Sequence, residues 1–481
     1  MNGRSKYVFP CVLALMGCVS QLPAGAQARH LITDYNAVGD GTALNTKAIQ
    51  SAIDRCAAAG GGMVVVPRGV FLTGALFFKP GVNLQIERDG VLKGTINQAD
   101  YPPIYTRWEG IERYWTSALL NFVGMTNVEV GGEGMIDGSG EAWPNRSGRG
   151  AATNSTTVAT SEPVSGNGAV SPARPATEHD FPSSGPTTAK LSFAPTPGEL
   201  PTVNAAGVAL SGARLGRPRT LVFQNCRAVR VSGLHFKNEA SWCVGFIYCE
   251  DALAENLTVR AAHTIPSSDG IDIDSCRQVR VTGCDIDCND DCISLKSGKD
   301  QDGLRVNRPC EEIVIEKTRF AYGHGGAAMG SETSGGIRNV EVRDCVAEAG
   351  NLAPIRFKSQ PSRGGVVENI TYRNLELRGT RQAFEFNLEW RMVPPLAPPA
   401  KVLPVVRNVR MIDISGAVNS AGIIHGLRDS PIRDLTFENC HLTAQRGLTV
   451  ENATNLDYSG LHLEVKSGKA VITQTTAGRQ E

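Results

Sequence analysis

The sequence carries no net charge, because 48 Lys and Arg residues balance 48 Asp and Glu residues. It has no strongly basic run either, so nothing in it points to nucleic-acid binding or to attraction by an anionic membrane surface. No apolar stretch is long enough to span a bilayer. Any affinity for a charged ligand must therefore come from a local cluster of side chains.

The N-terminus has the three parts of an export signal. Arg4 and Lys6 precede an apolar stretch at residues 8–19, and small residues follow at 24–26. This order predicts a signal peptide over residues 1–26 and a secreted or periplasmic protein. Residues 15–18 also resemble a lipoprotein cleavage box, so a lipid anchor through Cys18 is the alternative.

Cysteine is present in an odd number once the signal peptide is removed. Eleven of 13 cysteines remain, and an odd number cannot all pair. Several recur at similar places along the chain, which favours small buried residues stacked in a core over a disulfide framework: Cys226, Cys249, Cys276, Cys284, Cys345 and Cys440. No histidine completes a zinc set near Cys284, Cys288 and Cys292, so we predict no metal site there.

A short unit recurs imperfectly along the chain. Two apolar residues flank one polar residue, next to Asn, Asp or Gly, as in 229–231, 279–281, 340–342 and 435–437, and the unit at 313–315 has Val in the middle position. Alternation with period two indicates strands with one buried face, and repeats about twenty to forty residues apart indicate stacked coils. We therefore predict an all-β protein, a single-stranded right-handed parallel β-helix over residues 27–481. A propeller or sandwich fits less well, because the spacing is irregular and clean hairpin turns are missing.

Two segments depart from this repeat. An apolar stripe formed by Ile49, Ala52, Ile53 and Cys56 predicts a short helix, which ends at 60–62 and precedes a strand at 63–66. Such a helix would cap the open end of the β-helix. Residues 145–217 are rich in Ser, Thr, Ala, Pro and Gly, and we predict a disordered loop insertion there.

Four polar motifs interrupt successive repeats. They are Ser268-Asp269-Gly270, Asn289-Asp290-Asp291, Gly323-His324-Gly325 and Arg356-Phe357-Lys358. Equivalent positions on adjacent coils lie ~4.8 Å apart, so about one repeat between motifs predicts a stripe on one outer face. Alone, each motif is more typical of a turn or a solvated strand face. Together they predict a catalytic cluster.

In order and spacing, the four motifs resemble those of glycoside hydrolase family 28, the polygalacturonases. The stretch at residues 330–336 resembles the bacterial members more than the plant or fungal ones. The resemblance implies that Asp290 is the general acid and that Asp269 and Asp291 activate water. It further implies that His324 maintains the protonation of the acid and that Arg356 and Lys358 bind a uronate carboxylate. The substrate would be a pectic polysaccharide or an oligogalacturonide, hydrolysed with inversion and without metal or cofactor.

Elementary chemistry agrees with this assignment. Glycoside hydrolysis needs one protonated and one ionised carboxyl group. Crowded carboxylates meet this need, because like charges close together raise the pKa of one of them. An inverting pair is expected ~6.5–9.5 Å apart, which neighbouring coils could provide. Because Arg356 and Lys358 alternate with apolar residues, the two cations should share one face of a strand.

Several points stay open at this stage. The family has Asn-Thr before the first aspartate where this chain has Ser267-Ser268, so rhamnogalacturonan or xylogalacturonan are alternative substrates. A calcium-dependent pectate lyase and a non-catalytic carbohydrate-binding β-helix are the rival functions. Trp242 and Trp390 could stack on sugars or pack in the protein. Endo or exo cutting is undetermined, and a capped β-helix is expected to be a monomer.

Overall fold

The computed structural model describes residues 28–143, 215–391 and 397–474. The expected signal peptide lies outside these ranges, and so does nearly all of the expected 145–217 insertion. None of the helices in the described ranges is both long and apolar enough to cross a membrane.

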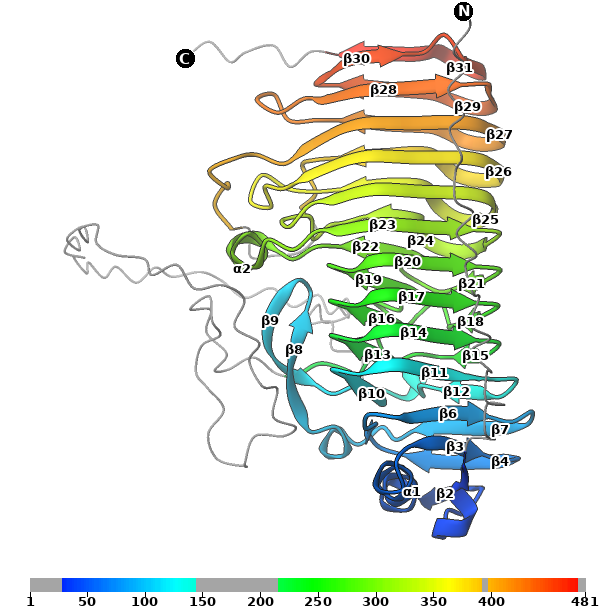
Figure 1. The fold of residues 1–481 in the computed structure, drawn as a ribbon. Helices are drawn as coiled ribbons and strands as arrows, with labels where there is room; N and C mark the ends of the chain where they lie inside the picture. Colours follow the sequence, from blue (N-terminus) through cyan, green and yellow to red (C-terminus); the bar gives the residue numbers. More distant parts are fainter. Residues whose placement is uncertain (1–27, 144–214, 392–396, 475–481) are drawn as a thin grey trace, which may run out of the picture.

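The described chain winds into stacked coils of short strands (Figure 1). The N-terminal strands are β1 (Arg29–Leu31), β2 (Asp40–Leu44), β3 (Gly62–Val66), β4 (Gly69–Thr73), β5 (Leu76–Phe77), β6 (Val82–Ile86), β7 (Gly90–Gly94), β8 (Pro103–Trp108), β9 (Ile111–Thr116), β10 (Leu120–Val123), β11 (Thr126–Gly132) and β12 (Met135–Asp137). The middle strands are β13 (Leu221–Gln224), β14 (Arg227–Ser232), β15 (His235–Lys237), β16 (Val244–Ile247), β17 (Glu250–Glu255), β18 (Thr258–Arg260), β19 (Ile271–Asp274), β20 (Arg277–Thr282), β21 (Asp285–Asp287), β22 (Ile293–Lys296) and β23 (Cys310–Glu316). The C-terminal strands are β24 (Arg319–Met329), β25 (Ile337–Lys358), β26 (Val366–Asn387), β27 (Val405–His425), β28 (Ile432–Glu438), β29 (Cys440–Glu451), β30 (Ala453–Asp457) and β31 (Leu461–Gln474). The helices are α1 (Thr46–Ala58) and α2 (Asp300–Val306), with 3-10 turns η1 (Ile32–Tyr35), η2 (Gln98–Asp100) and η3 (Gly140–Ala142).

Parallel pairing joins each strand to its equivalent on the next coil and produces three ladders. The ladder that matters for function, here called the first ladder, runs β5, β10, β13, β16, β19, β22 and β24, and continues through the last strand segments of β25, β26, β27, β29 and β31. The predicted right-handed parallel β-helix is therefore confirmed.

The repeat seen in the sequence sets both the inward faces and the corners of each coil. Val229 and Val231 are buried and align with Ala252 and Ala254 on the following coil, whereas Arg230 between them faces outward. Many corners carry Asn in the left-handed region, for example Asn369 with φ 57°, because its short amide side chain tolerates that conformation and forms local hydrogen bonds. Its side chain donates to Asn339 and accepts from Asn408, so the corners of three coils are tied together.

The core is one continuous column of apolar side chains along the axis. Phenylalanines stack from coil to coil, with ring centroids 4.9 Å apart between Phe122 and Phe223 and 5.4 Å apart between Phe223 and Phe246. All eleven described cysteines are buried and free, which confirms the interpretation of stacked core residues.

The predicted capping helix is confirmed as α1. Ile49, Ala52, Ile53 and Cys56 are fully buried and cover the N-terminal end of the core. One element was not anticipated from the sequence. Strands β8 and β9 form an antiparallel hairpin that stands against the coils beside α2 (Figure 1).

Candidate active site

The four predicted motifs meet at the first ladder. Asp269 precedes β19, Asp290 and Asp291 precede β22, and His324 lies within β24. The main chain ties them together: Gly270 N donates to Asp291 O at 3.0 Å, and His324 N donates to Asp290 O at 2.8 Å. These three motifs therefore lie on three adjacent coils, as the repeat length predicted.

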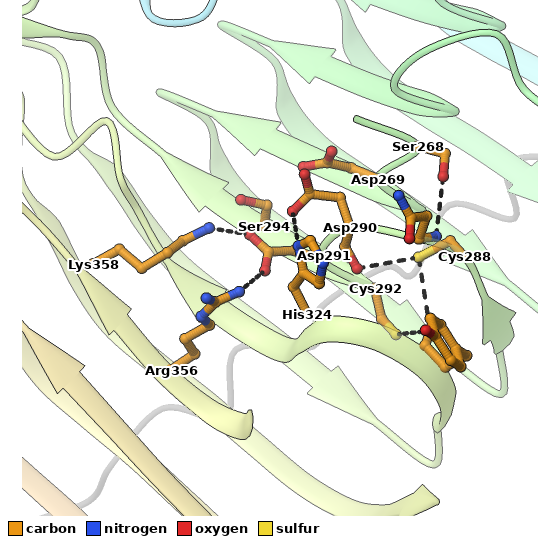
Figure 2. Close-up of polar contacts among 12 residues, drawn as sticks. Ser268, Asp269, Cys288, Asp290, Asp291, Cys292, Ser294, His324, Arg356 and Lys358 are labelled. Atoms are coloured by element: carbon orange, nitrogen blue, oxygen red, sulfur yellow. Dashed lines mark hydrogen bonds and ion pairs between the residues drawn. The ribbon is translucent and has the colours of Figure 1, made fainter. Parts of the chain in front are cut away.

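Three carboxylates converge in front of these strands (Figure 2). Asp269, Asp290 and Asp291 each place an oxygen within 4.8 Å of the other two. Asp269 and Asp291 are 3% and 0% exposed, whereas 30% of the Asp290 side chain is accessible. His324 is 36% exposed at its side chain, with Nδ1 3.3 Å from Asp290 Oδ1. Asp290 and His324 are thus the members of the cluster that a ligand reaches first.

Arg356 and Lys358 come from β25 and reach back two coils to Asp291. Arg356 is in register with Ala328, which is in register with Ser294, so the motif does not stack directly on the aspartates. Arg356 Nη1 lies 3.1 Å from Asp291 Oδ1, and Lys358 Nζ is hydrogen-bonded to Asp291 Oδ2 (Figure 2). The structure therefore unites the predicted cations with the predicted acids, and it places Asp291 between two cationic side chains.

The second contacts of these cations were not predicted. Arg356 Nε donates to Glu385 Oε2 at 2.7 Å, and Glu385 lies one coil further on. Both cations also face the ring of Trp390, at 4.9 Å for Arg356 and 5.6 Å for Lys358. Trp390, whose role the sequence left open, therefore packs beside the two cations in a cation–π arrangement.

The proton in the ligand-free cluster belongs on Asp269. Burial, together with the charges of Asp272 and Asp290, raises the pKa of Asp269 well above its usual range. Burial also acts to raise the pKa of Asp290, but the hydrogen bond to His324 and the charge of Lys358 outweigh it and leave that pKa below its ordinary value. Burial and neighbouring acids on one side, and His324 with Lys358 on the other, therefore move the pKa values of Asp269 and Asp290 apart.

A buried lysine under the cluster escaped the sequence analysis. Lys296, in β22, is 4% exposed, and its Nζ lies 3.7 Å from Asp269, 3.5 Å from Asp272 and 3.4 Å from Glu332. It also faces the ring of Trp242 at 4.5 Å. Burial acts to lower the pKa of Lys296, but the three carboxylates prevail and raise it well above the usual range.

The partners of Lys296 ionise very differently. Burial raises the pKa of Asp272 to about 7 in spite of the ammonium. For Glu332, Lys296 and Arg363 overcome the effect of burial and lower the pKa to about 2. The sequence offered one clue: Asp272 and Lys296 both interrupt apolar strand positions. Asp272 lies in the same ionic network as Asp269.

This charge balance bears on cation binding. The three aspartate oxygens are close enough to share one metal ion. However, Arg356, Lys358 and Lys296 already lie against the same carboxylates. Their positive charges would repel a metal ion in the space between the three aspartates.

Comparison with known proteins decides the family. The model of the glycosyl hydrolases family 28 matches residues 210–462, which include all four motifs. The chain belongs to glycosyl hydrolases family 28. A probable polygalacturonase of Vitis vinifera is 26% identical over 427 residues, which cover 86% of this chain and 74% of that protein. An exo-poly-alpha-D-galacturonosidase of Dickeya chrysanthemi is 27% identical over 449 residues, 89% of this chain and 70% of the other.

Solved structures agree with the fold. A hyperthermoactive exopolygalacturonase from Thermotoga maritima superposes with a TM-score of 0.67 at 26% identity, covering 93% of this chain and 91% of that one. A family 28 exopolygalacturonase from Yersinia enterocolitica gives 0.71 at 21% identity, covering 94% and 77%. This chain is accordingly a family 28 glycoside hydrolase.

The β8–β9 hairpin closes one side of this family 28 site. Gly110, at its tip, accepts a hydrogen bond from Lys299 N at 2.9 Å, and Glu112 N donates to Asp302 in α2 at 2.8 Å. Close to the tip, Arg107 forms a buried ion pair with Asp274 at 3.0 Å. Trp108 and Trp115 stack with Trp242 under the hairpin, which gives Trp242 a packing role. The hairpin therefore covers the first ladder on the N-terminal side of the aspartates.

The serine that departs from the family motif lies in a turn. Ser268 is fully buried; its Oγ donates to Ile265 O at 3.0 Å and accepts from Asn289 N at 3.0 Å. It thus connects the segment that carries Asp269 to the segment that carries Asp290.

Proposed function

We propose that this chain hydrolyses α-galacturonosyl linkages of the polygalacturonan backbone of pectin, and that it removes sugars from a chain end. The observation that carries the proposal is the trio Asp269, Asp290 and Asp291 held against Arg356 and Lys358. The trio supplies an acid and a base, and the cations supply recognition of a uronate carboxylate. The names of the relatives support the same substrate class.

In the proposed reaction, Asp290 donates its proton to the glycosidic oxygen as the bond from that oxygen to the anomeric carbon breaks. A water molecule attacks the anomeric carbon from the other side, and Asp269 or Asp291 accepts the proton that it loses. The accessibility of Asp290 supports its role as the acid, because the leaving group must reach it. His324 lies at the same carboxylate and modulates its charge.

Substrate binding would load the acid. In the free enzyme the pKa of Asp290 is low, largely because of His324 and Lys358. A galacturonate carboxylate at Arg356 and Lys358 would neutralise part of this positive charge and exclude water. Both effects raise the pKa of Asp290, so a proton would pass to it only when a substrate is bound.

The stereochemical outcome needs its own measurement. The closest aspartate oxygens approach within 4.8 Å, which is shorter than the ~6.5–9.5 Å expected between the carboxyl groups of an inverting pair. The proposal of inversion therefore rests on the family and not on this distance. Proton NMR of the first product distinguishes the two outcomes: the β anomer supports inversion, and the α anomer would replace single displacement by a covalent intermediate.

Cutting from a chain end is supported by the hairpin. With β8–β9 over the N-terminal side of the site, a polymer can leave the cluster freely only toward the C-terminal coils. We expect small products from the first minutes of reaction, with little loss of viscosity. A ladder of oligomers with rapid loss of viscosity would establish internal cutting instead.

The decisive experiment compares wild type with Asp290→Asn on polygalacturonate and on rhamnogalacturonan. Reducing ends should appear with wild type on polygalacturonate and fall by about 10²- to 10⁴-fold in the variant, which is the usual contribution of a general acid. Unsaturated, calcium-dependent product would identify a lyase. Equal activity of both proteins would refute the catalytic assignment, and preference for rhamnogalacturonan would replace the substrate.

Export is also part of the proposal, on the evidence of residues 1–26 alone. Fractionation of the native host followed by N-terminal sequencing tests it. A mature chain beginning at Gln27 is expected. A lipidated chain beginning at Cys18 would support the anchored alternative.

A further inference from the structure

A second charged feature lies on the C-terminal coils. A groove of about 360 Å³ crosses β26, β27, β29 and β31. Arg381, Arg446 and Lys469 line it, and no acidic residue does. We call it the distal groove. All three cations are exposed, and none has an ion-pair partner among the described residues.

Some arginines on the strands around the groove form ion pairs, unlike the three cations inside it. On the same strands, Arg378 pairs with Glu376 at 2.6 Å and Arg410 pairs with Glu438 at 2.8 Å. Exposed arginines beside the groove thus carry their own counter-charge, whereas those inside it do not. The groove is therefore a local site of positive potential on a chain that is neutral overall.

Strand register places the distal groove on the face of the active site. Arg356 is in register with Glu385, then Ile423, then Thr449, then Ile472. The last three of these residues line the groove. With ~4.8 Å between coils, the groove begins about 10 Å beyond Arg356 and extends to about 20 Å. The strands that line it come after β22 and β24 in the stack of coils, whereas the β8–β9 hairpin stands beside coils that come before them (Figure 1).

We infer that the distal groove is a second binding site for the substrate polymer and takes a polyuronate chain several sugars away from the bond that is cut. This inference rests on the proposed function. A polyuronate carries one carboxylate per sugar, which matches cations spread along several coils. Binding there would hold the polymer tail and raise its effective concentration at the aspartates. The groove would contribute nothing to a substrate too short to reach it.

The test removes the three positive charges together, in the variant Arg381→Ala/Arg446→Ala/Lys469→Ala. A matched control, Lys47→Ala/Arg55→Ala/Arg68→Ala, removes three exposed cations near the N-terminal end of the β-helix. These three also have no ion-pair partner in the described part of the chain. Both variants change the net charge equally. Because all six side chains are exposed, each variant should keep the wild-type melting temperature within a few degrees.

Steady-state kinetics on long polygalacturonate and on trigalacturonate distinguish the outcomes. At low salt, the groove variant should show a KM for the polymer about tenfold higher, equivalent to about 1.4 kcal/mol, with unchanged kcat. On trigalacturonate, the kinetic constants of the groove variant should match those of wild type. The control variant should match wild type on both substrates. Restoring charge with Arg381→Lys/Arg446→Lys should keep most of the wild-type KM.

Equilibrium binding of fluorescent polygalacturonate provides a readout without turnover. Weaker binding by the groove variant alone, with a difference that shrinks as salt rises, supports the inference. Equal polymer binding and equal KM in wild type and the groove variant would overturn the inference about the distal groove. Hydrolysis of trigalacturonate would in that case leave the proposed function intact. Absence of hydrolysis of either substrate by wild type would instead refute the proposed function.

Discussion

Lys296 is the residue whose removal tests the electrostatics of the site most directly. Its ammonium lies 3.4 to 3.7 Å from three buried carboxylates, one of which is Asp269. Lys296→Met keeps the length of the side chain and removes the charge. At 3.7 Å and an effective dielectric constant of about 20, the lost attraction on Asp269 is about 4.5 kcal/mol, or about 3 pKa units. Proton uptake by Asp272 and Glu332 offsets part of this loss, so we expect a rise of at least about one unit.

The assay is the pH dependence of kcat/KM. Asp269 must be ionised to accept a proton from water, and its pKa is already raised. A further rise moves the acidic limb of the profile to higher pH by at least about one unit, and the rate lost at low pH returns at high pH. Lys296→Arg, which keeps the charge, should leave the limb near its wild-type position.

A structural defect would look different from this electrostatic effect. Loss of the buried ammonium also destabilises the fold by about 3–5 kcal/mol, so the variant must be assayed well below its melting temperature. Misfolding lowers activity equally at every pH. An unmoved acidic limb in folded Lys296→Met would refute the role of Lys296 in setting the ionisation of Asp269.

Three further predictions follow from the same structure. Glu239 is fully buried and its pKa is raised to about 8, so its contribution to stability is present below pH 4.5 and is lost as pH rises through 8. In urea titrations, the free energy of unfolding of Glu239→Gln should therefore exceed that of wild type by roughly 3 kcal/mol at pH 7 and equal it at pH 4. Equal unfolding curves of the two proteins at pH 7 would contradict this. Arg356→Lys keeps the charge but loses one of the two contacts to Asp291 and Glu385, so kcat/KM should fall about 10- to 100-fold, and an unaffected rate would exclude recognition through the guanidinium. Eleven thiols should react in denaturant without reductant and almost none in the native mature enzyme, because the eleven cysteines are buried; a smaller number in denaturant would reveal disulfides.

Much of the fold follows from local pattern. Alternation as at 229–231 determines which side chains face inward, and Asn or Gly at the corners supplies the required backbone conformation. The helical stripe from Ile49 to Cys56 predicted α1 for the same reason, since periodicity is a property of neighbouring residues. The hairpin β8–β9 was missed because its contacts are to residues such as Asp274 and Asp302, far away in the sequence.

The candidate site divides in the same way. The motifs around Asp269, Asp290 and His324 could be found because one repeat of chain returns to nearly the same place on the next coil. The register that aligns Arg356 with Ser294 could not be predicted from the sequence, because the coils differ in length and β24 contains an irregularity. Lys296 was passed over because an isolated lysine in a strand carries no sign of three acids folded around it.

By itself, the sequence determined a repeating all-β chain, its inward faces, its cap and the acidic and basic residues of the site, because each of these depends on residue types at short, regular spacing. Only the tertiary structure decided which charges became buried and which acid holds the proton, because both depend on desolvation and on partners from other coils. It also decided that one end of the catalytic face is covered by a hairpin while the other opens onto unpaired cations, since that depends on how distant segments pack.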